Sequence, residues 1–238
     1  MTTPKASLIV ATRNRVTQLQ AGLQSIRDRA YEDVEMILVD DGSTDGSEGV
    51  IESYAGMFST IIRIPPRTSG YSWNPSSVLN AGHRAASSDI HMEQGGEVCH
   101  LTDCITPLIE ECRPGVVALA RCYHGPASDM ETLKLALAQG RVDLPPTVRP
   151  ELCRTEAGVW MAALVEPGGI ALYSGVERLA PFMFLGAIHR EDFEAVGGYD
   201  EKRKDRNDTD LANRLQARGV RFSFVGTAVA FHLQHAKA

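Results

Sequence analysis

The sequence predicts an α/β fold with a mostly parallel central sheet and helices on both of its faces. Two short apolar runs, residues 7–11 and 33–39, stop abruptly in polar and small residues, and a helical pattern follows each. Runs of this length that are rich in Val and Ile are typical of buried parallel strands. A third run at residues 60–64 completes a β-α-β-α-β alternation, which predicts one sheet with helices on its two faces.

The rest of the chain continues the alternation. Leu19, Leu23 and Ile26 follow helical spacing, and Gly219 is a typical helix stop. A connection at residues 140–158 contains three prolines and no clear period, and long loops of this kind are often functional lids. We expect further helices at residues 16–29, 47–54, 74–86, 102–112, 128–139, 190–196 and 208–217, and further strands at 89–92, 115–123, 159–165, 170–173, 221–225 and 228–233.

Composition narrows the class of protein. The chain has 238 residues, 43% of them apolar, and shows no repeat or internal boundary, so we expect one domain over residues 1–238. The net charge of -6 argues against a nucleic-acid binder. No apolar stretch approaches the roughly 18–20 residues of a membrane span, and the first residues lack a signal peptide's apolar core. Five cysteines without CxxC pairs favour reduced thiols and a cytoplasmic protein.

Polar side chains follow the first two predicted strands. Thr12, Arg13 and Asn14 come after the first, and Asp40 and Asp41 after the second. Because ligands of open α/β sheets gather at the carboxyl ends of the strands, these residues are expected to line one crevice. Each cluster taken alone also fits a strand end followed by a helix N-cap.

Four segments resemble the family 2 glycosyltransferases. The resemblance spans roughly residues 6–235 and is weakest between 125 and 180. It implies a GT-A type fold, which binds a nucleotide sugar in a single α/β domain. The segments that carry it are Ser7-Leu8-Ile9-Val10-Ala11-Thr12-Arg13-Asn14-Arg15, Val39-Asp40-Asp41-Gly42-Ser43-Thr44-Asp45, Leu79-Asn80-Ala81-Gly82-His83-Arg84-Ala85-Ala86, and a late block of Gly197-Gly198-Tyr199-Asp200-Glu201 with Asn207-Asp208-Thr209-Asp210-Leu211.

The resemblance implies a donor site at the first two strand ends. Residues 12–14 would touch the nucleoside, and Asp40 or Asp41 would accept a hydrogen bond from the base or ribose. We add Asn80 and Arg67 as donor contacts, since an arginine after the third strand could steady a phosphate, although a solvated arginine is the commoner outcome. A uridine diphosphate sugar is the donor expected from the family's habits.

The resemblance also implies that Asp208 is the general base. A sugar hydroxyl is a poor nucleophile, and a positioned carboxylate raises its reactivity by roughly 10²–10⁴-fold. Attack opposite the leaving diphosphate would invert the anomeric configuration. The alternative role for Asp208 is an N-cap. Asn207, Asp210 and Trp160 are candidate acceptor contacts; Asn207 stands where the family commonly has glutamate, and a tryptophan is more often a core residue than a sugar platform.

The metal site departs from the family pattern. Where relatives carry an acidic pair such as Asp-x-Asp, this chain has Glu93-Gln94-Gly95-Gly96-Glu97. Mn²⁺ or Mg²⁺ on carboxylates would neutralise the diphosphate. Glu97 is the first choice as ligand because the strand should have ended before it, and Glu93 is the second. His232 or His235 lies where some relatives place a further ligand, although a surface histidine is equally compatible with His235.

Two other functions stay open at this stage. A chain with a degenerate metal site could be a non-catalytic module that binds nucleotide sugars, and a nucleotidyltransferase has a related sheet but usually a glycine-rich loop after its first strand. The intact late block favours a transferase. Its acceptor would be a glycan, a lipid-linked acceptor or a small molecule, and the absence of an apolar span argues against a polymer-exporting synthase.

Overall fold

The computed structural model describes residues 4–66, 75–139, 149–150, 153–155, 160–161, 179–181, 183–203 and 207–235. They form a mixed sheet in the order β3-β2-β1-β4-β11-β6-β12-β5, with β7 paired to β6, and a small sheet in the order β10-β8-β9. The strands are β1 (Ala6–Thr12), β2 (Val34–Asp40), β3 (Thr60–Arg63), β4 (Ile90–Gly95), β5 (Val98–His100), β6 (Val116–Gly125), β7 (Arg149–Pro150), β8 (Cys153–Thr155), β9 (Trp160–Met161), β10 (Leu179–Pro181), β11 (Leu185–His189) and β12 (Arg221–Leu233).

The central strands give the predicted parallel arrangement. β1 pairs in parallel with both β2 and β4, and β2 pairs in parallel with β3. β11 then runs antiparallel to β4 and to β6, so the sheet is mixed but mostly parallel. The helices are α1 (Val16–Arg29), α2 (Ser47–Ser53), α3 (Pro75–Ala85), α4 (Ile105–Glu111), α5 (Ala127–Ala138), α6 (Arg190–Ala195) and α7 (Asn207–Ala217), with a short 3₁₀ turn at Ala55–Met57.

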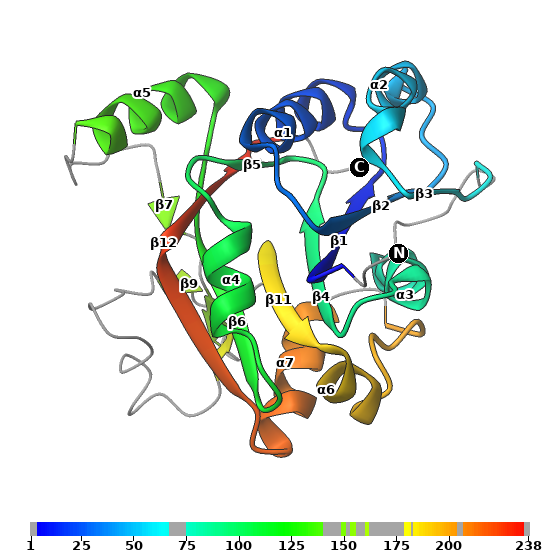
Figure 1. Cartoon of the computed structure of the whole chain (residues 1–238), viewed down its shortest axis with the longest axis vertical. Helices are drawn as coiled ribbons and strands as arrows, with labels where there is room; N and C mark the ends of the chain where they lie inside the picture. Colours follow the sequence, from blue (N-terminus) through cyan, green and yellow to red (C-terminus); the bar gives the residue numbers. More distant parts are fainter. Residues whose placement is uncertain are drawn as a thin grey trace.

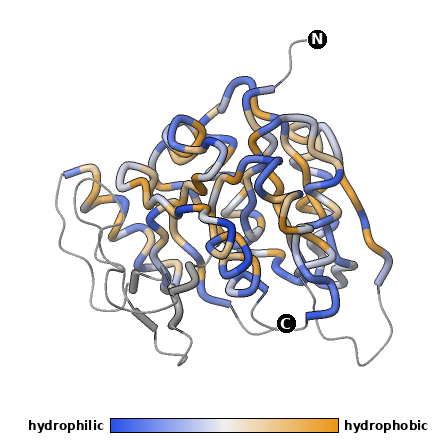
Figure 2. Tube along the Cα trace, turned by 90° about the horizontal axis from the view of Figure 1, so that it is seen from below, coloured by the Kyte–Doolittle hydropathy of each residue, from blue (hydrophilic) through white to orange (hydrophobic). Residues whose placement is uncertain are grey.

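Helices cover both faces of the sheet (Figure 1). In β1, Leu8 and Val10 belong to the core beneath α1, α2 and α4, whereas Ile9 and Ala11 belong to the core beneath α3, α6 and α7. This alternation is the period of two expected of a strand buried on both sides. Burying one such side chain contributes about 1.5–3 kcal/mol. Hydrophobic stretches accordingly run through the middle of the molecule (Figure 2).

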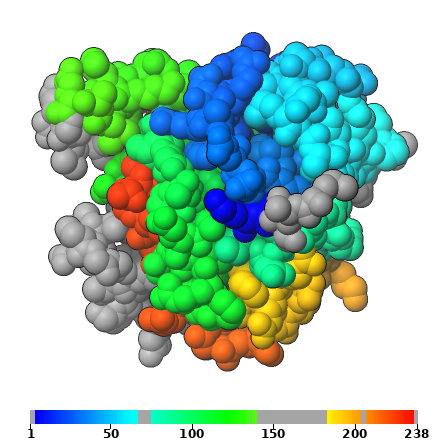
Figure 3. Space-filling model, viewed as in Figure 1, coloured from blue at the N-terminus to red at the C-terminus, as the bar shows by residue number. Residues whose placement is uncertain are grey.

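A third, smaller core lies at one end of the sheet. Met130 and Leu133 of α5 pack there with Tyr123 of β6 and Phe231 of β12. Figure 3 shows how segments far apart in the sequence meet, with the surface of α4 between those of β12 and of α6. Among the described residues, no helix is long and apolar enough to cross a membrane.

The structure corrects several predicted boundaries. β4 runs to Gly95 and is longer than the predicted strand 89–92, and β5 was not predicted at all. The two strands predicted at 221–225 and 228–233 are one strand, β12, with an irregularity between Val225 and Val229. Of the strand pair predicted at 159–165 and 170–173, only residues 160–161 lie within the described part, where they form β9.

Close packing of α3 on β1 predicts a sensitive glycine. A Cβ on Gly82 would lie 2.3 Å from Cγ2 of Ile9, which is fully buried. We expect Gly82→Ala to lower the free energy of unfolding by about 1–3 kcal/mol, because the core must be overpacked. Gly49 of α2 has open space around the same position, so Gly49→Ala is the matched control, with stability unchanged or raised by up to about 1 kcal/mol. Urea unfolding measures both, and equal stability of the two variants would contradict this packing.

Candidate active site

The carboxyl ends of β1 and β2 lie side by side. Thr12 is the register partner of Asp40, and the Asp41 backbone N–H donates to the Thr12 carbonyl over 3.0 Å. Asp41 is fully buried, and its carboxylate lies 3.2 Å from the Arg13 guanidinium. A charge-assisted contact shielded from water fixes both side chains, so the two strand ends form a rigid edge.

Side chains also lock the two loops that follow these strands. Asn14 adopts a left-handed φ of 48°, a conformation that asparagine tolerates well. Its backbone N–H donates to Ser43 Oγ over 2.9 Å, and its side-chain oxygen accepts from the Thr44 N–H over 2.8 Å. Asp40 accepts from the Ser43 N–H over 3.2 Å. The residues predicted to hold the nucleoside therefore lie together, and their contacts with a nucleoside stay a prediction.

The turn between β4 and β5 lies against these strand ends. The Gly96 N–H donates to the Ala11 carbonyl over 2.8 Å. A Cβ on Gly96 would lie 3.1 Å from Thr12 Oγ1, and a Cβ on Gly95 would lie 2.7 Å from the carboxyl carbon of Glu97. The Glu97 carboxyl thus fills the space that a side chain at residue 95 would occupy. This is the physical form of the departure seen in the sequence.

Glu97, His232 and His235 form a cluster, which we call the carboxylate–histidine cluster. Glu97 Oε1 lies 3.4 Å from His232 Nε2 and 3.6 Å from His235 Nε2. Antiparallel pairing of β5 with β12 sets Val98 opposite His232, so the residue before Val98 meets the end of β12. It is the one group of three possible metal ligands within 4.8 Å of one another that occurs in the described part of the chain.

The charge of Glu97 suits a cation. Burial acts to raise the pKa of Glu97, but the contacts with His232 and His235 outweigh it and hold this pKa well below its usual range. Glu97 Oε2 is buried and has no hydrogen-bond partner among the described residues. An ionised carboxylate with an unused oxygen, beside two imidazoles, fits a divalent metal ion. The mixed nitrogen and oxygen donors suit Mn²⁺ better than Mg²⁺, which prefers oxygen ligands alone.

His124 orients one member of the cluster. It is the register partner of His232 on the neighbouring strand β6, and the two Nδ1 atoms lie 2.8 Å apart. A hydrogen bond on the Nδ1 side of a histidine fixes its ring and leaves Nε2 for a metal. His232 Nε2 is the atom that faces Glu97.

The structure does not bring Glu93, the second predicted ligand, to the cluster. Met92 belongs to the core beneath α1, so its neighbour Glu93 points to the opposite face, beneath α3. There its carboxyl is 2.8 Å from His83 Nε2 and accepts a hydrogen bond from the Tyr199 hydroxyl. Burial is the main reason that the pKa of Glu93 is raised to about 8.

Asp208, the predicted base, lies at the first turn of α7. Its pKa is raised to about 7, mainly by burial and then by the charge of Glu93, while the backbone N–H of Met183 opposes the shift. A carboxyl group whose pKa lies near the working pH is suited to general base catalysis.

Residues 183–184 connect Asp208 to the cluster. Leu185 begins β11 opposite Gln94, near the end of β4, so Met183 lies at the carboxyl edge of the parallel strands. Met183 bonds Asp208, and the Phe184 ring lies 4.8 Å from the His232 ring. The predicted base and the carboxylate–histidine cluster therefore flank the same short segment at the edge where ligands of such sheets bind.

The other predicted contacts are placed differently. The Asn80 side chain donates to the Tyr199 carbonyl over 2.9 Å and accepts from the Tyr199 N–H over 3.0 Å, so it holds the late block rather than facing the strand ends. Asp210 pairs with Arg203 and Arg214. The remaining three are Asn207, whose buried Nδ2 has no partner among the described groups, Arg67, which lies outside the described residues, and Trp160, whose side chain also lies outside them.

Some residues of the site were missed or undervalued. The sequence gave His235 no preference over a surface position, and it did not single out Tyr199 or His124. Tyr199 had a signal, since it lies within the late block that carries the resemblance. His124 had none, because its role depends on which strand pairs with β12.

Comparison with known proteins places the chain in a family. The model of glycosyl transferase family 2 matches residues 7–137. EpsH of Bacillus subtilis (strain 168), named as a candidate glycosyltransferase, is 35% identical over 89 residues, which cover 37% of this chain and 25% of EpsH. EpsE of the same organism, with a similar name, is 36% identical over 61 residues, covering 26% of this chain and 22% of EpsE.

Solved structures share the fold at low sequence identity. GalNAc-T7 with UDP, GalNAc and Mn²⁺ has a TM-score of 0.65 at 14% identity, covering 98% of this chain and 44% of that one. TarS 1–349 of S. aureus with UDP-GlcNAc has a TM-score of 0.64 at 14%, covering 98% and 59%. The Pyrobaculum calidifontis mannosyltransferase PcManGT, in complex with GDP-Man and Mn²⁺, has a TM-score of 0.58 at 18%, covering 97% and 57%.

The fold and the class of enzyme predicted from the sequence are confirmed: this is an α/β chain of the GT-A type. The chain belongs to glycosyl transferase family 2. Its matches span about a quarter of the length of the curated relatives.

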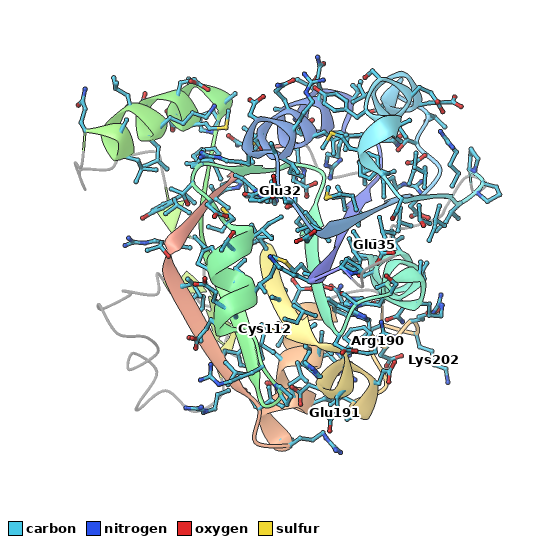
Figure 4. All side chains as sticks on the ribbon, in the orientation of Figure 1. Glu32, Glu35, Cys112, Arg190, Glu191 and Lys202 are labelled. Carbon is cyan, nitrogen blue, oxygen red and sulfur yellow. The ribbon has the colours of Figure 1, made fainter. Side chains whose placement is uncertain are left out.

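The cluster makes a prediction about metal binding. Glu97→Gln keeps the size of the side chain but removes its charge, so we expect the affinity for Mn²⁺ to fall by at least roughly 10–100-fold, the loss typical of outer-shell changes alone. Calorimetry with Mn²⁺ and no other ligand measures it. Glu32→Gln, at an exposed glutamate (Figure 4), is the matched control and should bind as the parent does. Equal affinity of Glu97→Gln and parent would remove this cluster as a metal site.

Proposed function

We propose that the chain is an inverting glycosyltransferase that moves a sugar from a nucleoside diphosphate donor to an acceptor hydroxyl with the help of a divalent metal ion. The observation that carries the proposal is the common position of Asp208 and the carboxylate–histidine cluster on either side of residues 183–184. One group would take the acceptor's proton, and the other would hold the leaving diphosphate.

The donor would lie along the ends of β1 and β2. Residues 12–14, Asp40 and Asp41 form the rigid edge that would receive the nucleoside. The glycines of the β4–β5 turn leave the backbone open beside it, so a diphosphate could approach closely. Two of the similar solved structures hold UDP or a UDP-sugar and one holds GDP-Man. A uridine diphosphate sugar is the first donor to test.

The metal would be Mn²⁺ held by Glu97, His232 and His235. When bound, it would supply positive charge that neutralises the diphosphate as the glycosidic bond breaks. The part of the protein is to keep Glu97 ionised and the two Nε2 atoms directed at one point. The ordered ring of His232, braced by His124, serves that purpose.

The chemical step would be a single displacement. Asp208 accepts the proton of the acceptor hydroxyl as its oxygen attacks the anomeric carbon on the face opposite the diphosphate, so the configuration inverts. The acceptor would be a glycan, a lipid-linked acceptor or a small molecule. The main alternative is a module that binds nucleotide sugars without turnover, which the replacement of the usual acidic pair by Gln94, Gly95 and Gly96 favours.

Replacing the base tests the enzyme against the binding module. We expect Asp208→Asn to lower release of nucleoside diphosphate by roughly 10²–10⁴-fold, because amide nitrogen cannot accept the proton. Donor affinity should stay unchanged. The measurement is diphosphate release from a panel of nucleotide sugars with Mn²⁺, with and without simple sugar acceptors, beside calorimetry for donor binding. Tight donor binding without turnover on any member of the panel would favour the module.

The pH dependence of the reaction should report the base. The pKa of Asp208 is raised to about 7, and the base must be unprotonated to act. Activity, as kcat/KM, should therefore be low below pH 6 and rise through a midpoint near 7. A profile that is flat between pH 5 and 8 would exclude Asp208 as the group that takes the proton.

A further inference from the structure

A cavity of about 270 Å³ lies between α3 and α6, away from the strand ends. His83, His91 and Phe193 line its inner part, and the exposed residues Arg84 and Glu194 line its mouth. None of the roles proposed above uses this cavity. Two of its lining residues are buried histidines, which is an unusual concentration of titratable groups.

His91 presents an unused nitrogen to this cavity. The residue is 2% exposed, and its Nε2 atom is buried without a hydrogen-bond partner among the described residues. A buried polar atom without a partner costs about 1–3 kcal/mol. Such an atom in a polar cavity calls for a water molecule or another hydrogen-bonding group beside it.

From His91 a continuous chain of hydrogen bonds runs inward. His91 Nδ1 lies 2.9 Å from His83 Nδ1, and His83 Nε2 lies 2.8 Å from Glu93 Oε2. The Tyr199 hydroxyl donates to Glu93 Oε1. The His83 ring is held flat against Phe193, with centroids 3.8 Å apart. The chain begins at the cavity and ends beneath the predicted base.

The inner end of the chain is electrostatically coupled to Asp208. The charge of Glu93 contributes to the raised pKa of Asp208, and both carboxylates act to raise the pKa of Tyr199. Two carboxyl groups in such a site cannot both ionise easily, so they titrate as a pair.

The geometry allows two proton arrangements only. Burial lowers the pKa of His83 and of His91 to about 3, so both rings are neutral, and their facing Nδ1 atoms share one proton. If His83 carries it, His83 Nε2 accepts from protonated Glu93, and His91 Nε2 carries a proton toward the cavity. If His91 carries it, His83 Nε2 donates to ionised Glu93, and His91 Nε2 is bare. The tautomers of both histidines are therefore fixed by the protonation state of Glu93.

We propose that Glu93, His83 and His91 form a proton relay that connects Asp208 with the cavity between α3 and α6. The relay rests on the proposed role of Asp208 as base. It would restore the base after each transfer, when a bound acceptor sugar separates Asp208 from solvent on the donor side.

The proton count balances along this path. His91 Nε2–H gives its proton to water in the cavity, His91 Nδ1 takes the proton of His83 Nδ1, and His83 Nε2 takes the proton of Glu93. Glu93, now ionised, receives the proton that Asp208 took from the acceptor, with the Tyr199 hydroxyl beside it as a bridge. One proton leaves Asp208, one enters the cavity, and no ring becomes charged.

Other charges near the relay influence it modestly. Arg190 at the start of α6 favours neutral His91, and Glu35 of β2 opposes it; Figure 4 shows both residues. Arg190 is engaged with the backbone carbonyls of Ala86 and Ser88. On the inner side, Arg214 of α7 acts to lower the pKa of Tyr199. None of them interrupts the chain between Glu93 and His91.

The first test needs no donor. In protein labelled with ¹⁵N histidine, NMR should show the His83 and His91 tautomers switching together as the pH rises through about 8, where Glu93 titrates, while both rings stay neutral. Glu93→Gln, which keeps the hydrogen bond but cannot ionise, should abolish the switch. Tautomers that stay constant from pH 6 to 9 in the parent would overturn the relay.

The second test measures turnover with a donor identified in the panel above. We expect His91→Ala to lower kcat by about tenfold, less than the loss of the base itself, with KM unchanged. Imidazole, which the enlarged cavity can admit, should restore the rate. His100→Ala is the matched control: His100 is equally buried and bonded to Gln94 and Tyr31, but it is not connected to Glu93.

The outcomes separate the two proposals. If Asp208→Asn leaves turnover intact, the base assignment fails and the relay loses its purpose. If Asp208→Asn abolishes turnover while His91→Ala matches the parent, or falls without rescue by imidazole as His100→Ala does, the relay alone is refuted and the histidines only stabilise the fold.

Discussion

Strand β4 determines where the polar groups of this enzyme can act. It lies between β1 and β11 with helices over both faces, so each of its side chains is committed to one face or the other. Met92 packs beneath α1 and α4, whereas His91 and Glu93 face α3. Only after the strand ends at Gly95 can a carboxylate reach the edge where ligands bind, and Glu97 is the first that does. A buried parallel strand tolerates polar groups only when they are paired, which is why Glu93 and both histidines are bonded to one another.

The sequence predicted the fold well because its signals are local. Apolar runs, helical spacing and glycine stops place most of the described elements within a few residues of their observed ends. It also placed Glu97 ahead of Glu93 for a physical reason that the structure supports, since the strand ends before residue 97. The short strand β5 escaped because Glu93 to His100 combines two glycines with mixed polarity and has no clear period.

The parts of the site that could not be predicted depend on contacts between distant segments. His235 joins Glu97 because the chain end after β12 runs beside the β4–β5 turn, where the Leu233 N–H donates to the Glu97 carbonyl over 3.0 Å. Asn80 was predicted as a donor contact from its place in a family segment, yet its amide is engaged by the backbone of Tyr199, 119 residues away. No local pattern contains such information, because it arises only when helix α3 packs against the late block.

The two faces of the sheet suggest how this chain divides its charges. The negative charge that develops on a leaving diphosphate would be met at the edge of the sheet, by the cluster that Glu97 and the end of β12 create. The positive charge released by the acceptor, its proton, would be met on the face beneath α3, where Asp208 and Glu93 are held near neutrality by burial. Residues 183–184 separate the two regions. A buried carboxyl that remains protonated near neutral pH destabilises the fold less than an ionised one, so the same desolvation that makes Glu93 tolerable in the core also makes it able to exchange a proton with a catalytic base.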